Sequence, residues 1–140
     1  MELLLLRHSI TPGNLKKQYI GVTDQPLAPE GEALAREKQP DMPRVEALWI
    51  SPMLRCRQTA QILFPGLCPR EIPDLRECNF GDFEGRTWAE IKDHPAFQAW
   101  MGGDQTAALP NGESVEAFYA RCRHGFRQVL QQARQLGIQR

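Results

Sequence analysis

The sequence predicts an α/β fold, a three-layer sandwich in which helices cover both faces of a mostly parallel sheet. Short apolar runs of the kind found in buried strands occupy residues 2–6 and 46–50, and a segment with helix signals follows each run. Alternating strands and helices imply right-handed crossovers, which place successive strands parallel and leave helices on both faces. The prediction of the fold therefore rests on the order of strands and helices along the chain.

The first helix is expected over residues 29–39. Ala33 and Leu34 should face inward, and Pro40 should end the helix because proline cannot continue it. A short extended piece near residues 71–73 is a candidate third strand.

A second helix is expected to open at Ser51-Pro52. A serine hydroxyl can cap the free N–H groups of a first turn, and proline at the first helical position loses no hydrogen bond. This helix should run to about Phe64, because Pro65-Gly66 follows.

Two further helices are predicted in the second half of the chain. Residues 87–90 (TWAE) fit a capping box, so a helix should start at Trp88 and be interrupted by Pro95. A long amphipathic helix should cover residues 114–135, with Gly137 as its stop. Its apolar face recurs at spacings of three and four and consists of Val115, Phe118, Cys122, Phe126, Val129, Leu130 and Ala133.

Length and charge limit the classes of protein. The 140 residues suit one domain, expected over 1–140, and 17 basic against 17 acidic residues leave no net charge to attract nucleic acid or an anionic membrane. The longest apolar run, residues 3–6, is far below the roughly 20 residues that span a bilayer. The four cysteines form no CxxC pair, which favours a reduced, cytoplasmic protein without a metal site.

Polar residues follow the first two predicted strands. Ligands of parallel sheets bind beyond the carboxyl ends of the strands, which selects Arg7-His8 and residues 51–55. The second segment also lies at a helix start, where anions are favoured. Guanidinium groups bind phosphate oxygens bidentately, and a neutral imidazole is a competent nucleophile. The two segments together predict an anion site, with phosphate as its ligand.

Five stretches carry motifs in a consistent order: LLLLRHSITPGN, YIGVTDQPLAPEGEALA, SPMLRCRQTAQIL, LRECNFGDFEGRTWAEI and LPNGESVEAFYARC. They resemble motifs of the histidine phosphatase superfamily, the phosphoglycerate-mutase-like enzymes. Together they span residues 3 to about 123. By this resemblance, His8 is the nucleophile that becomes transiently phosphorylated, and Arg7 and Arg55 clamp the transferring phosphoryl group.

The same resemblance assigns three more residues. Asn14 adds a donor to the phosphate, Gly21 lies in a loop that binds the substrate, and Glu77 is the general acid that protonates the leaving alkoxide. From the residues alone, Glu77 beside Arg76 fits a surface ion pair of little energetic weight better than a catalytic acid.

The charged residues near these motifs also have non-catalytic interpretations. The alternative for Arg55 is a solvated residue of a first helical turn. Arg57, two positions further, is expected to face away from the site. Asp82 and Glu84 are interpreted as loop residues with structural hydrogen bonds.

The chain departs from the family pattern at two places. Ser9 replaces a glycine, which would cost about 1 kcal/mol if the backbone there is left-handed or crowded. The family also carries a second histidine, in an H-G-G turn after a later strand. We expect His124 to be solvated inside the long helix and His94 to be a favourable charge at a helix C-terminus.

Ile138 resembles the start of a new strand, so the chain is interpreted as a C-terminally incomplete domain. Its exposed strand edges would favour association, for example as a homodimer.

The resemblance implies a phosphomonoesterase that needs no cofactor. It is most similar to small bacterial phosphatases of the α-ribazole phosphatase type, so the expected partner is a small-molecule phosphomonoester such as α-ribazole 5′-phosphate. A phosphomutase of the same family and a non-catalytic module that binds phosphate esters are the alternatives.

Overall fold

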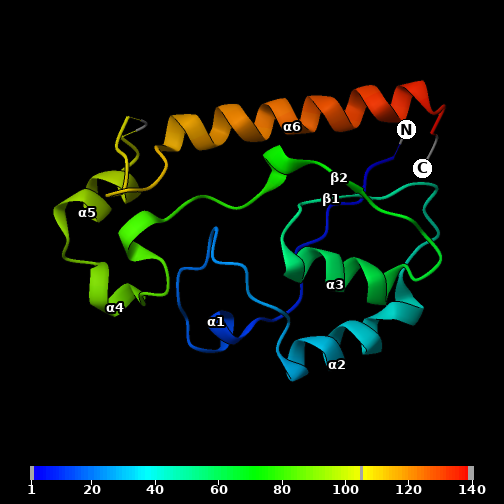
Figure 1. Ribbon diagram of the computed structural model, residues 1–140, viewed down its shortest axis with the longest axis horizontal. Helices are drawn as coiled ribbons and strands as arrows, with labels where there is room; N and C mark the ends of the chain where they lie inside the picture. The colour runs from blue at the N-terminus through cyan, green and yellow to red at the C-terminus, as the bar shows by residue number, and fades with distance from the viewer. Residues whose placement is uncertain (1, 105, 139–140) are drawn as a thin grey trace.

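The computed structural model describes residues 2–104 and 106–138, and it shows three layers (Figure 1). Helix α6 (Val115–Gln135) forms one outer layer, and α2 (Pro29–Lys38) with α3 (Leu54–Leu63) forms the other. Strands β1 (Trp49–Ile50) and β2 (Arg70–Glu71) lie between them. The predicted α/β class is confirmed.

The sheet is small and parallel. Trp49 pairs with Arg70, and Ile50 with Glu71. The Arg70 N–H donates to the Leu48 carbonyl at 2.8 Å. Helix α3 connects the two strands, so it forms the crossover that parallel pairing requires.

The prediction of a β-strand over residues 2–6 is wrong. Residues 2–10 lie outside any helix or strand, and none of them pairs with another described residue in a β-ladder. The four leucines Leu3, Leu4, Leu5 and Leu6 are 44%, 48%, 81% and 47% exposed. A strand requires ladder hydrogen bonds to a neighbouring strand, and no described residue forms such a ladder with this segment.

Helix α2 confirms the predicted position but not the predicted inward face. Ala35 and Gly31 are buried, whereas Ala33 and Leu34 are not. The reason is a close backbone contact, because a side-chain carbon on Gly31 would run into the carbonyl of Ile10. The face that carries Gly31 therefore packs inward.

Helix α3 starts later than predicted and with a different cap. Its N-cap is Met53 rather than Ser51, and Asp24 from a distant loop accepts the Leu54 N–H at 2.7 Å. A carboxylate at a helix N-terminus satisfies a free donor and complements the helix dipole. A tertiary contact thus replaces the local cap.

Short elements complete the chain. They are α1 (Pro12–Leu15), η1 (Gln39–Asp41), η2 (Pro73–Leu75), η3 (Gly81–Phe83), α4 (Trp88–Ile91) and α5 (Pro95–Met101). The predicted capping box of Thr87 and Glu90 is confirmed at the start of α4. His94 is the N-cap of α5 and its Nδ1 accepts the Ala96 N–H at 3.2 Å, so its predicted place at a helix C-terminus is wrong.

Helix α6 confirms the long amphipathic helix. The Ser114 hydroxyl accepts the Ala117 N–H at 3.1 Å, and Gly137 adopts a φ of +66° just past the end of the helix. Of the predicted face, Val129 and Ala133 are buried, while Phe126 stays 38% exposed. Figure 1 shows α6 running along one side of the molecule above β1 and the N-terminal segment.

The larger core cluster lies at the other end of the molecule from β1 and β2. It consists of Cys78, Phe80, Phe83, Ile91, Phe97 and Leu109. Tyr19 packs edge-on against two aromatic rings of this cluster, at 5.3 and 5.4 Å between ring centroids. Across the described residues, no helix is both long and apolar enough to span a bilayer.

Candidate functional site

His8 is half-buried and follows the N-terminal leucine run and Arg7, and the tautomer of its ring follows from one hydrogen bond. Its Nδ1 lies 2.7 Å from the carbonyl oxygen of Ser9. A carbonyl oxygen only accepts, so Nδ1 carries the proton of the neutral ring and Nε2 keeps its lone pair. This tautomer presents Nε2 as a nucleophile.

The surroundings lower the pKa of His8 below its ordinary value of 6.5. Burial is the largest cause, and the positive charges of Arg55 and Arg7 add to it, while the bond to Ser9 and the charge of Glu77 act in the opposite direction. The ring is therefore kept neutral at physiological pH, as nucleophilic attack requires.

Ser9 shows no backbone strain. It is absent from the residues with positive φ, which contradicts the penalty expected for serine in place of glycine. Its hydroxyl donates to the Gly31 carbonyl at 2.7 Å, and its N–H donates to the Thr59 hydroxyl at 3.0 Å. That hydroxyl in turn donates to the Arg55 carbonyl at 2.7 Å. Thr59, which sequence reasoning missed, therefore ties the residue after His8 to the backbone of Arg55.

Arg55 is buried rather than solvated, with 2% of its surface exposed. Its Nη2 donates to the Gly21 carbonyl at 2.9 Å and its Nη1 to the Thr23 carbonyl at 3.2 Å. A guanidinium has five N–H donors, so three are left, and the buried Nε has no partner among the described residues. Arg55 thus has donors to offer an anion while its position is fixed by the loop.

The loop that Arg55 contacts is held from its other side by Glu84. The Glu84 carboxylate accepts the N–H groups of Gly21, Val22 and Thr23 at 3.0, 3.0 and 3.2 Å. It also accepts the Thr23 hydroxyl at 2.7 Å and the Phe80 N–H at 3.0 Å. The prediction that Glu84 makes structural hydrogen bonds is confirmed, but the sequence did not indicate its partners.

These hydrogen bonds act on the pKa of Glu84. Burial alone would raise it, but the bonds from Thr23, Gly21, Phe80 and Val22 together outweigh burial and lower it below 4.5. The carboxylate is therefore ionised when it holds the loop.

Both backbone polar groups of Gly21 form hydrogen bonds within the protein. Its N–H donates to Glu84, and its carbonyl accepts from Arg55. A side-chain carbon at this position would run into the Cys78 carbonyl, so only glycine permits this approach.

Asn14 lies in the short helix α1 and completes a capping box with Thr11, the N-cap. Its Oδ1 accepts the N–H and the hydroxyl of Thr11, both at 3.0 Å. These bonds orient the carboxamide and leave its Nδ2 without a partner among the described residues. Nδ2 is the donor that an added anion could use.

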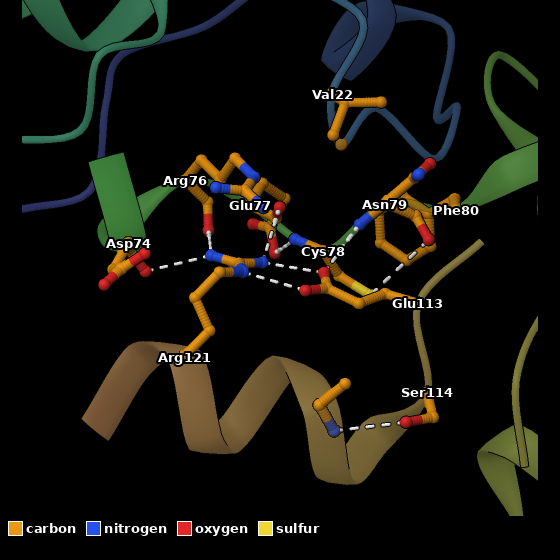
Figure 2. A network of polar contacts seen from close by, with 12 residues as sticks. Val22, Asp74, Arg76, Glu77, Cys78, Asn79, Phe80, Glu113, Ser114 and Arg121 are labelled. Atoms are coloured by element: carbon orange, nitrogen blue, oxygen red, sulfur yellow. Dashed lines mark hydrogen bonds and ion pairs between the residues drawn. The ribbon is translucent and has the colours of Figure 1, made fainter. Parts of the chain in front are cut away.

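Four of the six predicted site residues line one groove of about 640 Å³: Arg7, His8, Arg55 and Glu77. Asn14 and Gly21 do not line it. Arg7 and Glu77 are exposed, and the Glu77 Oε1 accepts the Cys78 N–H at 2.8 Å (Figure 2). The apolar part of the groove is formed mainly by residues 3–6, β1, α3 and the inner face of α6. Two guanidinium groups, the Glu77 side chain and the His8 imidazole therefore line the same groove, and the charges of Arg55, Arg7 and Glu77 all act on His8.

The residues expected outside the site have other partners. Arg57 forms a two-bond ion pair with Glu71, at 2.6 and 2.9 Å. His124 is exposed but lies 2.5 Å from the Asp74 carboxylate and does not line the groove. No group of three or more metal-ligating side chains occurs within residues 2–104 and 106–138.

Comparison with known proteins places residues 3–138 within the family model described as histidine phosphatase superfamily (branch 1). Sedoheptulose 1,7-bisphosphatase of Saccharomyces cerevisiae is 33% identical over 81% of this chain and 49% of its own length.

Two solved structures share the fold. A phosphoglycerate mutase of Thermus thermophilus is 40% identical, with a TM-score of 0.69 over 82% of this chain and 64% of the other. A candidate α-ribazole-5′-P phosphatase of Escherichia coli K-12 is 26% identical, with a TM-score of 0.81 over 96% of this chain and 68% of the other. The chain thus spans about half to two thirds of the length of these proteins.

Proposed function

The chain belongs to the histidine phosphatase superfamily, and from this premise we propose that it hydrolyses phosphomonoesters through a phosphohistidine at His8. One observation carries the proposal: the His8 ring keeps Nε2 unprotonated in the groove that Arg7 and Arg55 also line. Phosphoryl transfer depends mainly on in-line positioning and on positive charge around the equatorial oxygens, and this arrangement supports both.

In the first step, the lone pair of His8 Nε2 attacks phosphorus. The bond from phosphorus to the ester oxygen breaks, and its electron pair stays on that oxygen. Glu77 donates a proton to the same oxygen, so a neutral alcohol leaves. Arg7 and the unused donors of Arg55 neutralise the phosphoryl oxygens during the transfer.

In the second step, water attacks the phosphohistidine. The Glu77 carboxylate takes a proton from that water, the phosphorus–nitrogen bond breaks, and inorganic phosphate leaves. His8 and Glu77 return to their starting protonation states, so the two proposed steps together consume only the phosphomonoester and water.

The proposed substrate is a small phosphorylated metabolite. The similarity to the candidate α-ribazole-5′-P phosphatase supports α-ribazole 5′-phosphate as the first compound to assay. The similarity to a phosphoglycerate mutase supports a second candidate function, transfer of the phosphoryl group to a bound product instead of water. A mutase would accumulate phosphoenzyme and return the group to an added alcohol.

The decisive experiment compares His8→Ala with wild type after incubation with a radiolabelled phosphomonoester. Wild type should retain an acid-labile, base-stable label, and His8→Ala should retain none. His124→Ala is the matched control, because this histidine pairs with Asp74 outside the groove and should label normally. Label retained on His8→Ala would overturn the assignment.

A further inference from the structure

Arg121 on α6 is buried against the segment that carries Glu77, and its three guanidinium nitrogens all donate within the protein. Its side chain is 10% exposed. Nε and Nη2 donate to the two carboxylate oxygens of Glu113 at 2.8 and 2.7 Å. The remaining donors go to the carbonyls of Asp74, Arg76 and Glu77 at 2.9, 2.9 and 3.3 Å.

Glu113 extends this contact to the other side of Glu77. Its Oε2 accepts the Asn79 N–H at 3.2 Å, and its own N–H donates to the Asn79 carbonyl at 2.9 Å. Figure 2 shows the result: Arg121 reaches up from α6 to the backbone before and at Glu77, and Glu113 holds the backbone just after it. The Glu77 side chain lines the groove.

We infer that Arg121 and Glu113 are positioning residues that aim the carboxyl group of Glu77 at the leaving oxygen of the substrate. This inference rests on the proposed function and deepens it. The pair contacts the backbone around Glu77, whereas the backbone next to His8 is held by Thr59 and the Arg55 guanidinium by the loop at residues 21–23. Loss of the pair should therefore damage proton donation and spare attack by His8.

The charge arrangement suits this role. The hydrogen bonds from Arg121 are the largest cause that lowers the pKa of Glu113, so the pair is ionised and its bonds are charge-assisted. Lysine cannot replace Arg121 here, because one ammonium group cannot reach a carboxylate and three carbonyls in a planar fork.

The test uses two substrates that differ in their need for a general acid. 2,4-Dinitrophenolate leaves phosphorus without a proton, whereas the alkoxide of glycerol 2-phosphate needs one. Arg121→Lys should lower kcat/KM for glycerol 2-phosphate by about 10²-fold, as partial loss of general acid catalysis implies, and leave kcat/KM for 2,4-dinitrophenyl phosphate nearly unchanged. The comparison uses kcat/KM because this constant reports the steps up to release of the alcohol and excludes the second step, in which Glu77 also takes part. Glu77→Gln should show the same selectivity more strongly.

Arg123→Lys is the matched control, because Arg123 is exposed on the same helix and should affect neither substrate. Thermal melting checks that each variant folds, and Glu113→Gln, which removes one charge and keeps the side-chain shape, replaces Arg121→Lys if the latter does not. An equal loss on both substrates would show a merely structural role and overturn the inference while the proposed function stands. If wild type does not hydrolyse even 2,4-dinitrophenyl phosphate, the proposed function fails and the inference fails with it.

Discussion

The guanidinium of Arg55 and the carboxylate of Glu84 hold opposite sides of one backbone loop. Arg55 donates to the carbonyls of Gly21 and Thr23, and Glu84 accepts the N–H groups of the same two residues. The two charged groups thus act on the loop through its backbone, one on its carbonyls and the other on its N–H groups. Arg55, which we propose binds the phosphoryl group, is thereby fixed before any ligand arrives, which would reduce the entropy lost on binding.

Glu84→Gln should weaken the fold. The amide keeps one acceptor oxygen but turns an NH₂ group toward backbone donors, so N–H groups lose their partner. The free energy of unfolding should fall by about 2 kcal/mol, measured by chemical denaturation at neutral pH. Glu116→Gln, an exposed control, should stay within about 0.5 kcal/mol.

The same variant should change the pH dependence of stability. Hydrogen bonds lower the folded-state pKa of Glu84 below 4.5, so its contribution is complete above that value and is lost as the pH falls through the lowered pKa. Glu84→Gln should remove this contribution at every pH. Parallel acid-unfolding curves for wild type and variant would contradict the assignment.

Gly21→Ala should disturb both the fold and the site. The added carbon would meet the Cys78 carbonyl, and the loop can only move by breaking bonds to Glu84 or Arg55. We expect a loss of about 2 kcal/mol or more in stability, the range of overpacked cores, together with weaker binding of inorganic phosphate by calorimetry. Gly66→Ala meets nothing within 4 Å and should change neither quantity.

Arg55→Ala should lower kcat/KM by a factor that corresponds to about 2–4 kcal/mol, because it removes charge-assisted contacts to the transferring group. Arg57→Ala, two positions further along α3, loses only an ion pair that is about half exposed and should change kcat/KM little. Steady-state kinetics on p-nitrophenyl phosphate distinguish the two. Equal losses would show that Arg55 does not contact the phosphoryl group.

Activity should not begin to decline until the pH falls below 6.5. The pKa of His8 lies below 6.5, so the neutral nucleophile predominates until the pH falls below that lowered value, and kcat/KM should decline only there. Arg7→Ala removes one of the charges that lower the pKa, so the acidic limb of the kcat/KM profile should move to higher pH. An unchanged limb position would mean that Arg7 does not influence His8.

Local signals predicted some elements well because their causes are local. The capping box of Thr87 and Glu90 depends on residues within one turn and occurs as predicted. The periodic apolar face predicted a helix over residues 114–135, and α6 covers Val115–Gln135. The start of α3 was wrong because its donor is satisfied by Asp24, 30 positions away. The strand over residues 2–6 was wrong because pairing depends on a neighbour that the run itself does not supply.

The sequence by itself determined the family, the sequence motifs and the residues from which a phosphate site can be built, since these depend on residue type and order. Only the tertiary structure decided how those residues are held. Glu84 binds a loop 63 positions earlier, and Arg121 binds carbonyls 44 to 47 positions earlier. The choice of a hydrogen-bond partner depends on distances of about 3 Å between segments that only folding brings together, and spacing along the chain does not encode such distances.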